Sequence, residues 1–372
     1  MKKYIALLLV MIMALSMVAC GGSKAPATDA PAADAPAADA VTEAIEAVVE
    51  EGEVPYLGIT IFNYSNNYVG YIRNGIDYYM SEKYPDYKYL MVDGENDQAT
   101  QTERIDTMIS KGVNVLCVNP VDSSAGATIL QKAKDAGIAI IFFNRMPEMD
   151  VLNSYDKCWY VGEDAYSQGA VQGELVATEW EKNKDSWDLN GDGKLQYVLL
   201  KGVAGHSNTE DRANGLKDKL VELGVEVEEL AAENADWATA TALEVTETWI
   251  GKFGDKIEMV LSSNDAMALG AVEALKNNGM IGGEHSVPVV GVNALPEAAQ
   301  LIKDGIMFGS VLTSTYDLAT GTVDMAVNAV LGNDILEGTA WTELEDGKIV
   351  RTYGTAITAE NIDVGIAGHK IG

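Results

Sequence analysis

The sequence predicts an α/β protein built from two doubly wound parallel-sheet lobes. Short apolar runs alternate with segments of helical spacing from residue 56 onward, and the runs are apolar throughout, as strands buried on both faces are. The alternation starts again after a break at Pro147, which predicts a second unit of the same kind. Gly112 and Gly137 follow predicted helices, at positions where a left-handed residue ends a helix.

The predicted elements alternate strictly in both units. In the first unit, strands are expected at 56–62, 87–92, 113–118 and 138–143, and helices at 69–84, 98–111 and 123–136. In the second unit, strands are expected at 159–161, 196–201, 225–230, 257–262, 288–292 and 307–312, and helices at 165–182, 209–223, 238–252, 267–278 and 296–303. Because ligands of open α/β sheets bind beyond the carboxyl ends of the strands, two such units facing each other would form a cleft.

The first residues have the pattern of an export signal. A basic start at Lys2 and Lys3 precedes an apolar run at 5–18, so residues 1–19 are expected to be a signal peptide. Residues 17–20 resemble a bacterial lipobox, in which a cysteine such as Cys20 is lipidated; an ordinary signal peptide with a chance cysteine is the alternative. Residues 20–53 are rich in Ala, Pro and acids and are expected to form a disordered, lipid-anchored linker. The protein is therefore expected outside the cytoplasm, anchored to a membrane.

Charge and motif content exclude several function classes. The 372 residues include 26 Lys and Arg against 56 Asp and Glu, and a formal net charge of −30 argues against a nucleic-acid partner. The sequence contains no P-loop, strand-borne dinucleotide motif, nucleophile elbow or zinc-protease motif. Cys117 and Cys158 are expected to be buried structural thiols. We therefore expect a binding protein and not an enzyme; a two-domain enzyme of the same architecture is the alternative.

Residues 188–196 have the spacing of a calcium-binding loop. Oxygen ligands fall at loop positions 1, 3, 5, 7 and 9, and Gly193 occupies position 6, where a sharp turn is needed. The five positions are Asp188, Asn190, Asp192, Lys194 through its carbonyl, and Gln196. Leu199 stands where a bidentate glutamate is usual, so another acid would have to complete a Ca²⁺ site. A solvated turn is the alternative.

Polar and aromatic side chains mostly follow predicted strands in both units. The polar set is Asn66, Asn119, His206, Asn208, Arg212, Asn264, Asn293 and Thr313, and the aromatic set is Tyr68 and Trp237. Each asparagine alone could cap a helix or form a turn. Their shared position at strand ends favours one common cleft. A pyranose has polar edges and apolar C–H faces, so amide, guanidinium and aromatic groups suit it as a ligand.

From about residue 56 to residue 355 the chain resembles the bacterial galactose/glucose-binding proteins, the substrate-binding components of sugar ABC importers. The matching stretches are 111–113, 142–144, 154–157, 187–190, 198–202, 264–276 and 294–298. The run at 264–276 matches almost throughout and is far more specific than any single motif.

This resemblance implies a type I periplasmic-binding fold, in which three strand crossings form a hinge between the lobes. By position, the crossings fall near 142–143, 311–313 and 351–355. The N-terminal lobe would then be 55–143 plus 314–350, and the C-terminal lobe 144–310 plus 355–372. We expect a monomer.

The resemblance also implies roles for individual residues. Five positions keep the family's residue types in its sugar site: Asn119, His206, Arg212, Trp237 and Asn264. Tyr68 replaces a Phe, Thr313 replaces an Asn, and three amides stand where the family has Asp, namely Asn66, Asn208 and Asn293. Asp211 and Asp265 lie close in sequence and could supply the missing charge. Glu258 matches the distant carboxylate of the family's Ca²⁺ site.

The sequence thus predicts an extracytoplasmic lipoprotein that captures a hexose, galactose or glucose, between two closing lobes and delivers it to an ABC permease. One alternative is a sensory protein that presents sugar to a chemoreceptor or sensor kinase. Another is a binder of a different monosaccharide or of a uronate, because three carboxylates are replaced by amides. The export signal argues against a sugar-responsive repressor.

Overall fold

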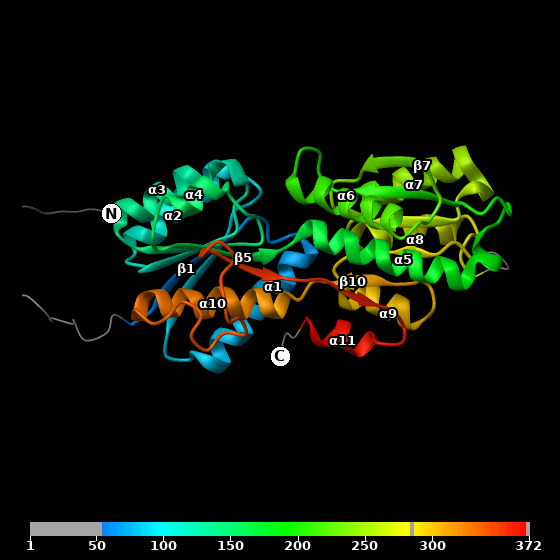
Figure 1. Ribbon diagram of the computed structural model, residues 1–372. Coiled ribbons are helices and arrows are strands. Elements are labelled where there is room, and N and C mark those ends of the chain that lie inside the picture. The colour runs from blue at the N-terminus through cyan, green and yellow to red at the C-terminus, as the bar shows by residue number, and fades with distance from the viewer. Residues whose placement is uncertain (1–53, 283–285, 370–372) are drawn as a thin grey trace, which may run out of the picture. The chain divides into compact units, whose positions relative to one another are not determined.

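The computed structural model describes residues 54–282 and 286–369 (Figure 1). The predicted signal peptide at 1–19 and the predicted linker at 20–53, with Cys20, lie outside the described residues. Among the helices of the described stretches, none is both long and apolar enough to cross a membrane.

The first lobe is built on a parallel sheet. Its strand order is β11 (Ile349–Thr352), β5 (Cys158–Glu163), β4 (Ala139–Phe143), β3 (Val115–Val118), β1 (Tyr56–Ile61) and β2 (Lys88–Asp93). One face packs against α1 (Asn67–Lys83) and α10 (Thr315–Leu331). The other face packs against α2 (Gln98–Ser110), α3 (Gly126–Ala136) and α4 (Met149–Asn153), as Figure 1 shows; a short 3₁₀ turn, η1 (Ser123–Ala125), leads into α3.

The second lobe repeats this three-layer arrangement. Its parallel sheet has the order β7 (Val227–Asn234), β6 (Leu195–Lys201), β8 (Met259–Ser262) and β9 (Val289–Val290). Helices α5 (Ala165–Trp187) and α6 (Ser207–Glu222) cover one face. The opposite face packs against α7 (Thr239–Phe253), α8 (Asp265–Asn277) and α9 (Pro296–Lys303). A 3₁₀ turn, η2 (Gly254–Lys256), follows α7. The antiparallel pair β10 (Ser310–Leu312) and β12 (Thr355–Ile357) joins this lobe, followed by α11 (Ile362–Ala367).

Alternating side chains explain why the strands are apolar throughout. On β3, Cys117 points to the layer of α1 and α10, and its neighbours Leu116 and Val118 point to the layer of α2 and α3. All three are fully buried, because helices cover both faces of the sheet. Cys117 and Cys158 are both free and buried, which confirms the prediction that both thiols are buried.

The strand order places a switch point in each lobe. In the first sheet β1 lies between β3 and β2, and in the second sheet β6 lies between β7 and β8. Connections on the two sides of such a central strand run in opposite directions, which leaves a crevice at its carboxyl end. Phe62 follows β1, and the loop to His206 follows β6, so both crevices carry pocket residues.

One predicted lobe boundary is wrong. β5 pairs with β4 and β11 in the first sheet, so the chain first leaves that lobe after Glu163 and not near residues 142–143. Residues 158–163 therefore belong to the N-terminal lobe, although we predicted them in a C-terminal lobe beginning at 144. The chain passes between the lobes at two further places: β10 is followed by α10 of the first lobe, and β11 is followed by β12 of the second.

The prediction also missed α10. Its sequence contains Thr322, Val323 and Val327, β-branched residues that are not strong helix formers. Because buried positions occupy most sides of the helix, the polar stripe that marks an amphipathic helix is missing.

Candidate functional site

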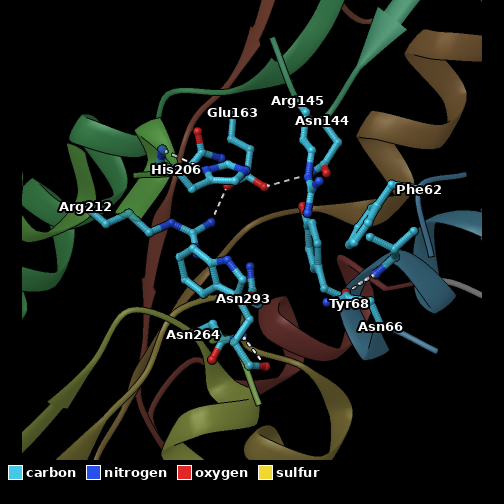
Figure 2. Close-up of a pocket in the computed structure, with 13 residues that line it drawn as sticks. Phe62, Asn66, Tyr68, Asn144, Arg145, Glu163, His206, Arg212, Asn264 and Asn293 are labelled. Atoms are coloured by element: carbon cyan, nitrogen blue, oxygen red, sulfur yellow. Dashed lines mark hydrogen bonds and ion pairs between the residues drawn. The ribbon is translucent and has the colours of Figure 1, made fainter. Parts of the chain in front are cut away.

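Residues at strand ends and helix starts of both lobes line one pocket (Figure 2). The first lobe contributes Phe62, Asn66, Tyr68, Val69, Asn144, Arg145 and Glu163. The second contributes His206, Asn208, Arg212, Trp237, Asn264 and Asn293. Eight of the ten predicted sugar-site residues line this pocket, so their shared position at strand ends was the informative signal.

Asn119 and Thr313 are the two predicted residues that do not line the pocket. Asn119 is fully buried behind it, where its Oδ1 accepts the N–H of Phe62 at 3.2 Å and its Nδ2 donates to the carbonyl of Phe143 at 3.1 Å. Thr313 accepts a hydrogen bond from Asn293 Nδ2 at 2.7 Å. Both residues therefore hold lining residues in place.

Three lining residues cap helices. Asn66 Oδ1 accepts the N–H of Val69 at 3.1 Å, and Asn264 Oδ1 accepts that of Met267 at 2.9 Å. His206 Nδ1 accepts the N–H of Asn208 at 3.2 Å. Asn66 and Asn264 therefore do both things that the sequence left open: each caps a helix, and each lines the pocket. Capping uses one lone pair of each amide oxygen, so each asparagine still offers the pocket an N–H₂ donor and a second oxygen lone pair.

An ion pair joins the lobes inside the pocket. Arg212 Nη2 bonds Glu163 Oε2, while Arg212 Nε donates to Gln168 Oε1 at 3.0 Å and Nη1 donates to the carbonyl of Ser263 at 2.7 Å. Glu163 Oε1 also accepts Asn144 Nδ2 at 3.4 Å. The Arg212 and Glu163 side chains are only 6% and 1% exposed, so each charge depends on the other for compensation.

Glu163 corrects our expectation about the pocket's charge. We predicted that Asp211 or Asp265 could supply it, but neither lines the pocket. Asp265 is fully buried, where it accepts hydrogen bonds from Ser310 Oγ and from the N–H of Leu295, and burial raises its pKa to about 6.

His206 is neutral in this setting. Burial, with smaller contributions from the nearby Arg145 and Arg212, lowers its pKa to about 4. Its Nδ1 accepts a backbone N–H, which leaves the Nε2 hydrogen as a donor. His206 therefore adds a hydrogen-bonding group and no charge near neutral pH.

The indole of Trp237 is held against the second-lobe wall. Its backbone has φ 61°, in the left-handed region that a bulky residue rarely adopts. A Cβ added to Gly202 would lie 1.9 Å from Trp237 Cζ2, so this wall has room for the ring because residue 202 is glycine. The His206 ring meets the indole edge-on at 6.2 Å, and Arg212 Cζ lies 5.7 Å from the indole centroid.

Left-handed backbone recurs elsewhere around the pocket. Asn144 has φ 63° and Asn293 has φ 120°, and with Trp237 they are among eight non-glycine residues of positive φ in the described chain. Such conformations cost free energy and persist where the surroundings impose them, often at functional sites.

Sequence reasoning missed five lining residues: Phe62, Val69, Asn144, Arg145 and Glu163. Asn144 and Arg145 directly follow β4, so the strand-end rule could have found them. Glu163 ends β5, a strand that we placed in the wrong lobe. Arg145 packs its guanidinium over the Phe62 ring, with Cζ 3.6 Å from the centroid, which no spacing in the sequence indicates.

The loop at 188–196 is tightly bonded to itself. Asp192 accepts the N–H of Lys194 at 2.9 Å, Asn190 Nδ2 at 3.2 Å and Gln196 Nε2 at 2.9 Å. Asp188 Oδ2 accepts the N–H of Gly193 at 2.8 Å.

Glu258 reaches this loop from the strand side. It is 2% exposed, and its two oxygens accept the N–H groups of Leu189 and Gln196, both at 2.8 Å. Throughout the described residues, no three His, Cys, Asp or Glu side chains form a group that could hold a metal ion. A cation here would therefore need the amide oxygens and the carbonyl as well as the carboxylates.

With this geometry established, comparison with known proteins identifies the family. Residues 57–334 match the periplasmic binding protein domain, which covers more than half of the chain. The chain belongs to the periplasmic binding protein family. This membership confirms the predicted family, the two-lobed α/β fold and the prediction that the chain is not an enzyme, and it agrees with a location outside the cytoplasm.

Within this periplasmic binding protein family, one relative is the D-galactose/methyl-galactoside binding periplasmic protein MglB of Haemophilus influenzae. It is 37% identical over 307 residues, which cover 82% of this chain and 90% of the relative. The xylitol-binding protein of Mycolicibacterium smegmatis is 28% identical over 83% of this chain and 79% of its own length. A solved ABC transporter solute binding protein from Bacillus halodurans with bound myo-inositol has a TM-score of 0.70 at 25% identity, covering 86% of this chain and 99% of that one.

Proposed function

We propose that this protein captures a hexose between its two lobes and delivers it to an ABC permease. The observation that carries the proposal is a pocket in which both lobes supply hydrogen-bonding side chains beside aromatic faces. Asn66, Asn264 and Asn293 suit ring hydroxyls, and Trp237 and Tyr68 suit C–H faces. The relatives named above are described with galactose or methyl-galactoside, xylitol and myo-inositol, all small polyhydroxylated compounds.

The division of the pocket between lobes explains how capture would work. A ligand drives closure only as far as it binds the closed state better than the open state. A sugar touching both Asn66 and Trp237 makes its full set of contacts only when the lobes are together. Closure would then mark the loaded state for the permease.

Galactose and glucose are the hexoses we propose first. The 37% identical relative is named for galactose, and the pocket keeps His206, Arg212, Trp237 and Asn264. Amides at 66, 208 and 293 pair with hydroxyls less strongly than carboxylates would, so we expect lower affinity than a carboxylate-lined pocket would give.

The ligand itself can be identified directly. The full chain, purified without refolding, would be examined by native mass spectrometry and the released ligand by chromatography against sugar standards. The proposal expects one bound hexose per chain. A reproducibly bound compound that is not a monosaccharide would overturn it.

The same pocket would serve a sensory protein, because a receptor also recognises the closed form. Cross-linking in membranes, followed by identification of the captured partner, distinguishes a transport protein from a sensory protein. Capture of an ABC permease is the expected result, and capture of a chemoreceptor or sensor kinase alone would favour the alternative.

We also propose that Cys20 carries a lipid anchor, which rests on the lipobox-like residues 17–20 and the linker composition. One acyl chain binds membranes only marginally, so the two or more chains of a bacterial lipoprotein matter. The Cys20→Ser variant should move to the soluble fraction. Recovery of the unmutated protein entirely in the soluble fraction would contradict the anchor.

Finally, we propose that the 188–196 loop holds Ca²⁺ with Glu258. All candidate donors are oxygens, which suits a hard cation: Asp188, Asn190, Asp192, the Lys194 carbonyl, Gln196 and Glu258. The amide groups of Asn190 and Gln196 now direct N–H donors at Asp192. Turning each amide by half a rotation would direct its oxygen there instead, so the residues fit the ion. Its contribution would be to tie α5, β6 and the start of β8 together.

A further inference from the structure

Asn293 lines the pocket from a turn whose backbone is strained (Figure 2). Asn293 has φ 120° and the next residue, Ala294, has φ 52°, and residues other than glycine rarely adopt such values. Conformations of this kind persist only where the surroundings hold them. The position of the Asn293 side chain in the pocket therefore depends on what holds residues 293–295.

Asp265, a fully buried carboxylate at the start of α8, holds this turn from behind. Its Oδ2 accepts the N–H of Leu295 at 2.7 Å, and its Oδ1 accepts the hydroxyl hydrogen of Ser310 at 2.7 Å. The same Ser310 oxygen accepts the N–H of Ala294 at 3.0 Å. One carboxylate thus fixes, directly or through Ser310, both residues that follow Asn293.

The neighbouring backbone leaves room for this carboxylate. A Cβ added to Gly291 would lie 2.1 Å from Asp265 Oδ1, so the carboxylate reaches Ser310 because residue 291 is glycine. Asp265 does not line the pocket, so it can act on a ligand only through the turn that it holds. An ionised acceptor makes hydrogen bonds roughly twice as strong as a neutral one does, which suits the task of holding a strained turn.

The charge of Asp265 can change within an ordinary pH range. Burial raises its pKa to about 6, against the opposing effect of its two hydrogen bonds. Among charged side chains, Arg212 of α6 lowers this pKa and Glu297 of α9 raises it, both with smaller effects. On the other side of the turn, His369 Nε2 lies 2.9 Å from the carbonyl oxygen of Asn293, and burial lowers the pKa of His369 below that of an ordinary histidine.

We propose that Asp265 is a positioning residue for the hexose: its ionised carboxylate holds Asn293 in the pocket, and its protonation weakens sugar binding. This rests on the proposed function, since Asn293 lines the same pocket. In the protonated carboxyl one oxygen carries a hydrogen and donates instead of accepting, and the remaining bonds lose the assistance of the charge. The turn is then held less firmly, and Asn293 is less often in place for the sugar.

Acid should move this group's contributions to stability and to affinity in opposite directions. The pKa of Asp265 lies above the ordinary value of an aspartate, so its protonation favours the folded state, and that contribution to stability is lost as the pH rises through about 6. Hexose affinity, in contrast, should fall as the pH falls through the same range. A loss of binding caused by Asp265 is therefore not a loss of folded protein.

The test is calorimetric titration of the full chain with galactose and with glucose at about pH 7.5 and at about pH 5, on either side of that pKa. The wild type should bind roughly five- to tenfold more weakly at the acidic pH. Asp265→Asn copies the protonated carboxyl, because an amide has one acceptor oxygen and N–H donors in nearly the same shape. This variant should have the weaker affinity at both pH values, with the pH dependence lost.

Asp324→Asn is the matched control. Asp324 is also a buried carboxylate, bonded to Tyr79 and Tyr84 in the first lobe, and it does not line the pocket. This control should keep the wild-type affinity and pH profile. Ser310→Ala serves if Asp265→Asn does not fold, which a thermal melt would show. It removes the hydroxyl between Asp265 and the turn, so it should weaken hexose binding at about pH 7.5.

Three outcomes overturn the inference. A wild-type affinity that is equal at the two pH values, or an affinity of Asp265→Asn equal to that of the wild type at about pH 7.5, contradicts it and leaves the proposed function intact. A fall in acid that survives in Asp265→Asn removes Asp265 as its cause. Binding of neither galactose nor glucose by the wild type contradicts the proposed capture of a hexose, and the inference falls with it.

Discussion

The pocket between the lobes and the loop at 188–196 are both polar, but they are assembled in opposite ways. The loop gathers its oxygens within one short stretch, and only Glu258 comes from elsewhere. The pocket gathers its groups from the ends of β1, β4 and β5 and from the second lobe. Spacing therefore indicates the loop in the sequence, whereas the pocket's charge balance depends on which strands lie side by side.

The largest expected effect comes from breaking the charge pair that joins the lobes. Arg212→Met leaves the buried Glu163 carboxylate without its partner, so the free energy of unfolding should fall by about 3–5 kcal/mol. Urea denaturation measures it.

The double variant Glu163→Gln/Arg212→Met tests whether the unpaired Glu163 carboxylate causes this loss of stability. Removing both charges should restore part of the lost stability, because no uncompensated charge is left. A single Arg212→Met variant as stable as wild type would show that the pair has little importance.

The next largest effect concerns the aromatic wall. Trp237→Ala removes a large apolar face from the pocket, and by analogy with binding hot spots hexose affinity should fall by about 2–4 kcal/mol. Calorimetric titration measures the loss. Trp159→Ala, which changes a half-buried indole outside the pocket, should keep the wild-type affinity. Equal losses in the two variants would mean that the effect is not specific to the pocket.

The loop is tested by removing the proposed metal. If Ca²⁺ binds only the folded state, it adds about 2.7 kcal/mol at a hundredfold excess over its dissociation constant. Chelator should lower the melting temperature of the wild type and have little effect on Glu258→Gln. Glu210→Gln, an exposed carboxylate elsewhere in the second lobe, should respond as the wild type does. A melting curve that chelator leaves unchanged in the wild type would rule the site out.

The smallest effect tests whether the pocket depends on a residue behind its wall. Gly202→Ala places a Cβ against the Trp237 ring, which must then move, and we expect roughly tenfold weaker hexose binding, about 1.4 kcal/mol. Gly251→Ala on α7 is the control, since a Cβ there meets nothing within 4 Å. Wild-type affinity in Gly202→Ala would show that the ring position is not critical.

Much of the architecture was predictable because strand and helix periodicities are local. Helix α9 was predicted at 296–303, the range observed, and β8 was predicted two residues longer at its start. The lobe assignment of β5 was not predictable in this way, since its pairing with β11 joins Tyr160 to Ile349, residues far apart in the sequence.

The same distinction between local pattern and tertiary packing applies to the residues of the site. Asn66, Asn264 and Asn293 were found because each follows a strand, a property of the sequence alone. Glu163 was missed because its meeting with Arg212 depends on how two lobes come together. Asn119 does not line the pocket, and its place behind the wall depends in the same way on the packing of β1, β3 and β4.

The central claim is that the pocket holds one hexose. Calorimetric titration of the full chain with galactose and with glucose tests it most directly. The account predicts saturable heat at one site per chain for at least one of these sugars, weakened in Trp237→Ala. No heat from either galactose or glucose would contradict it.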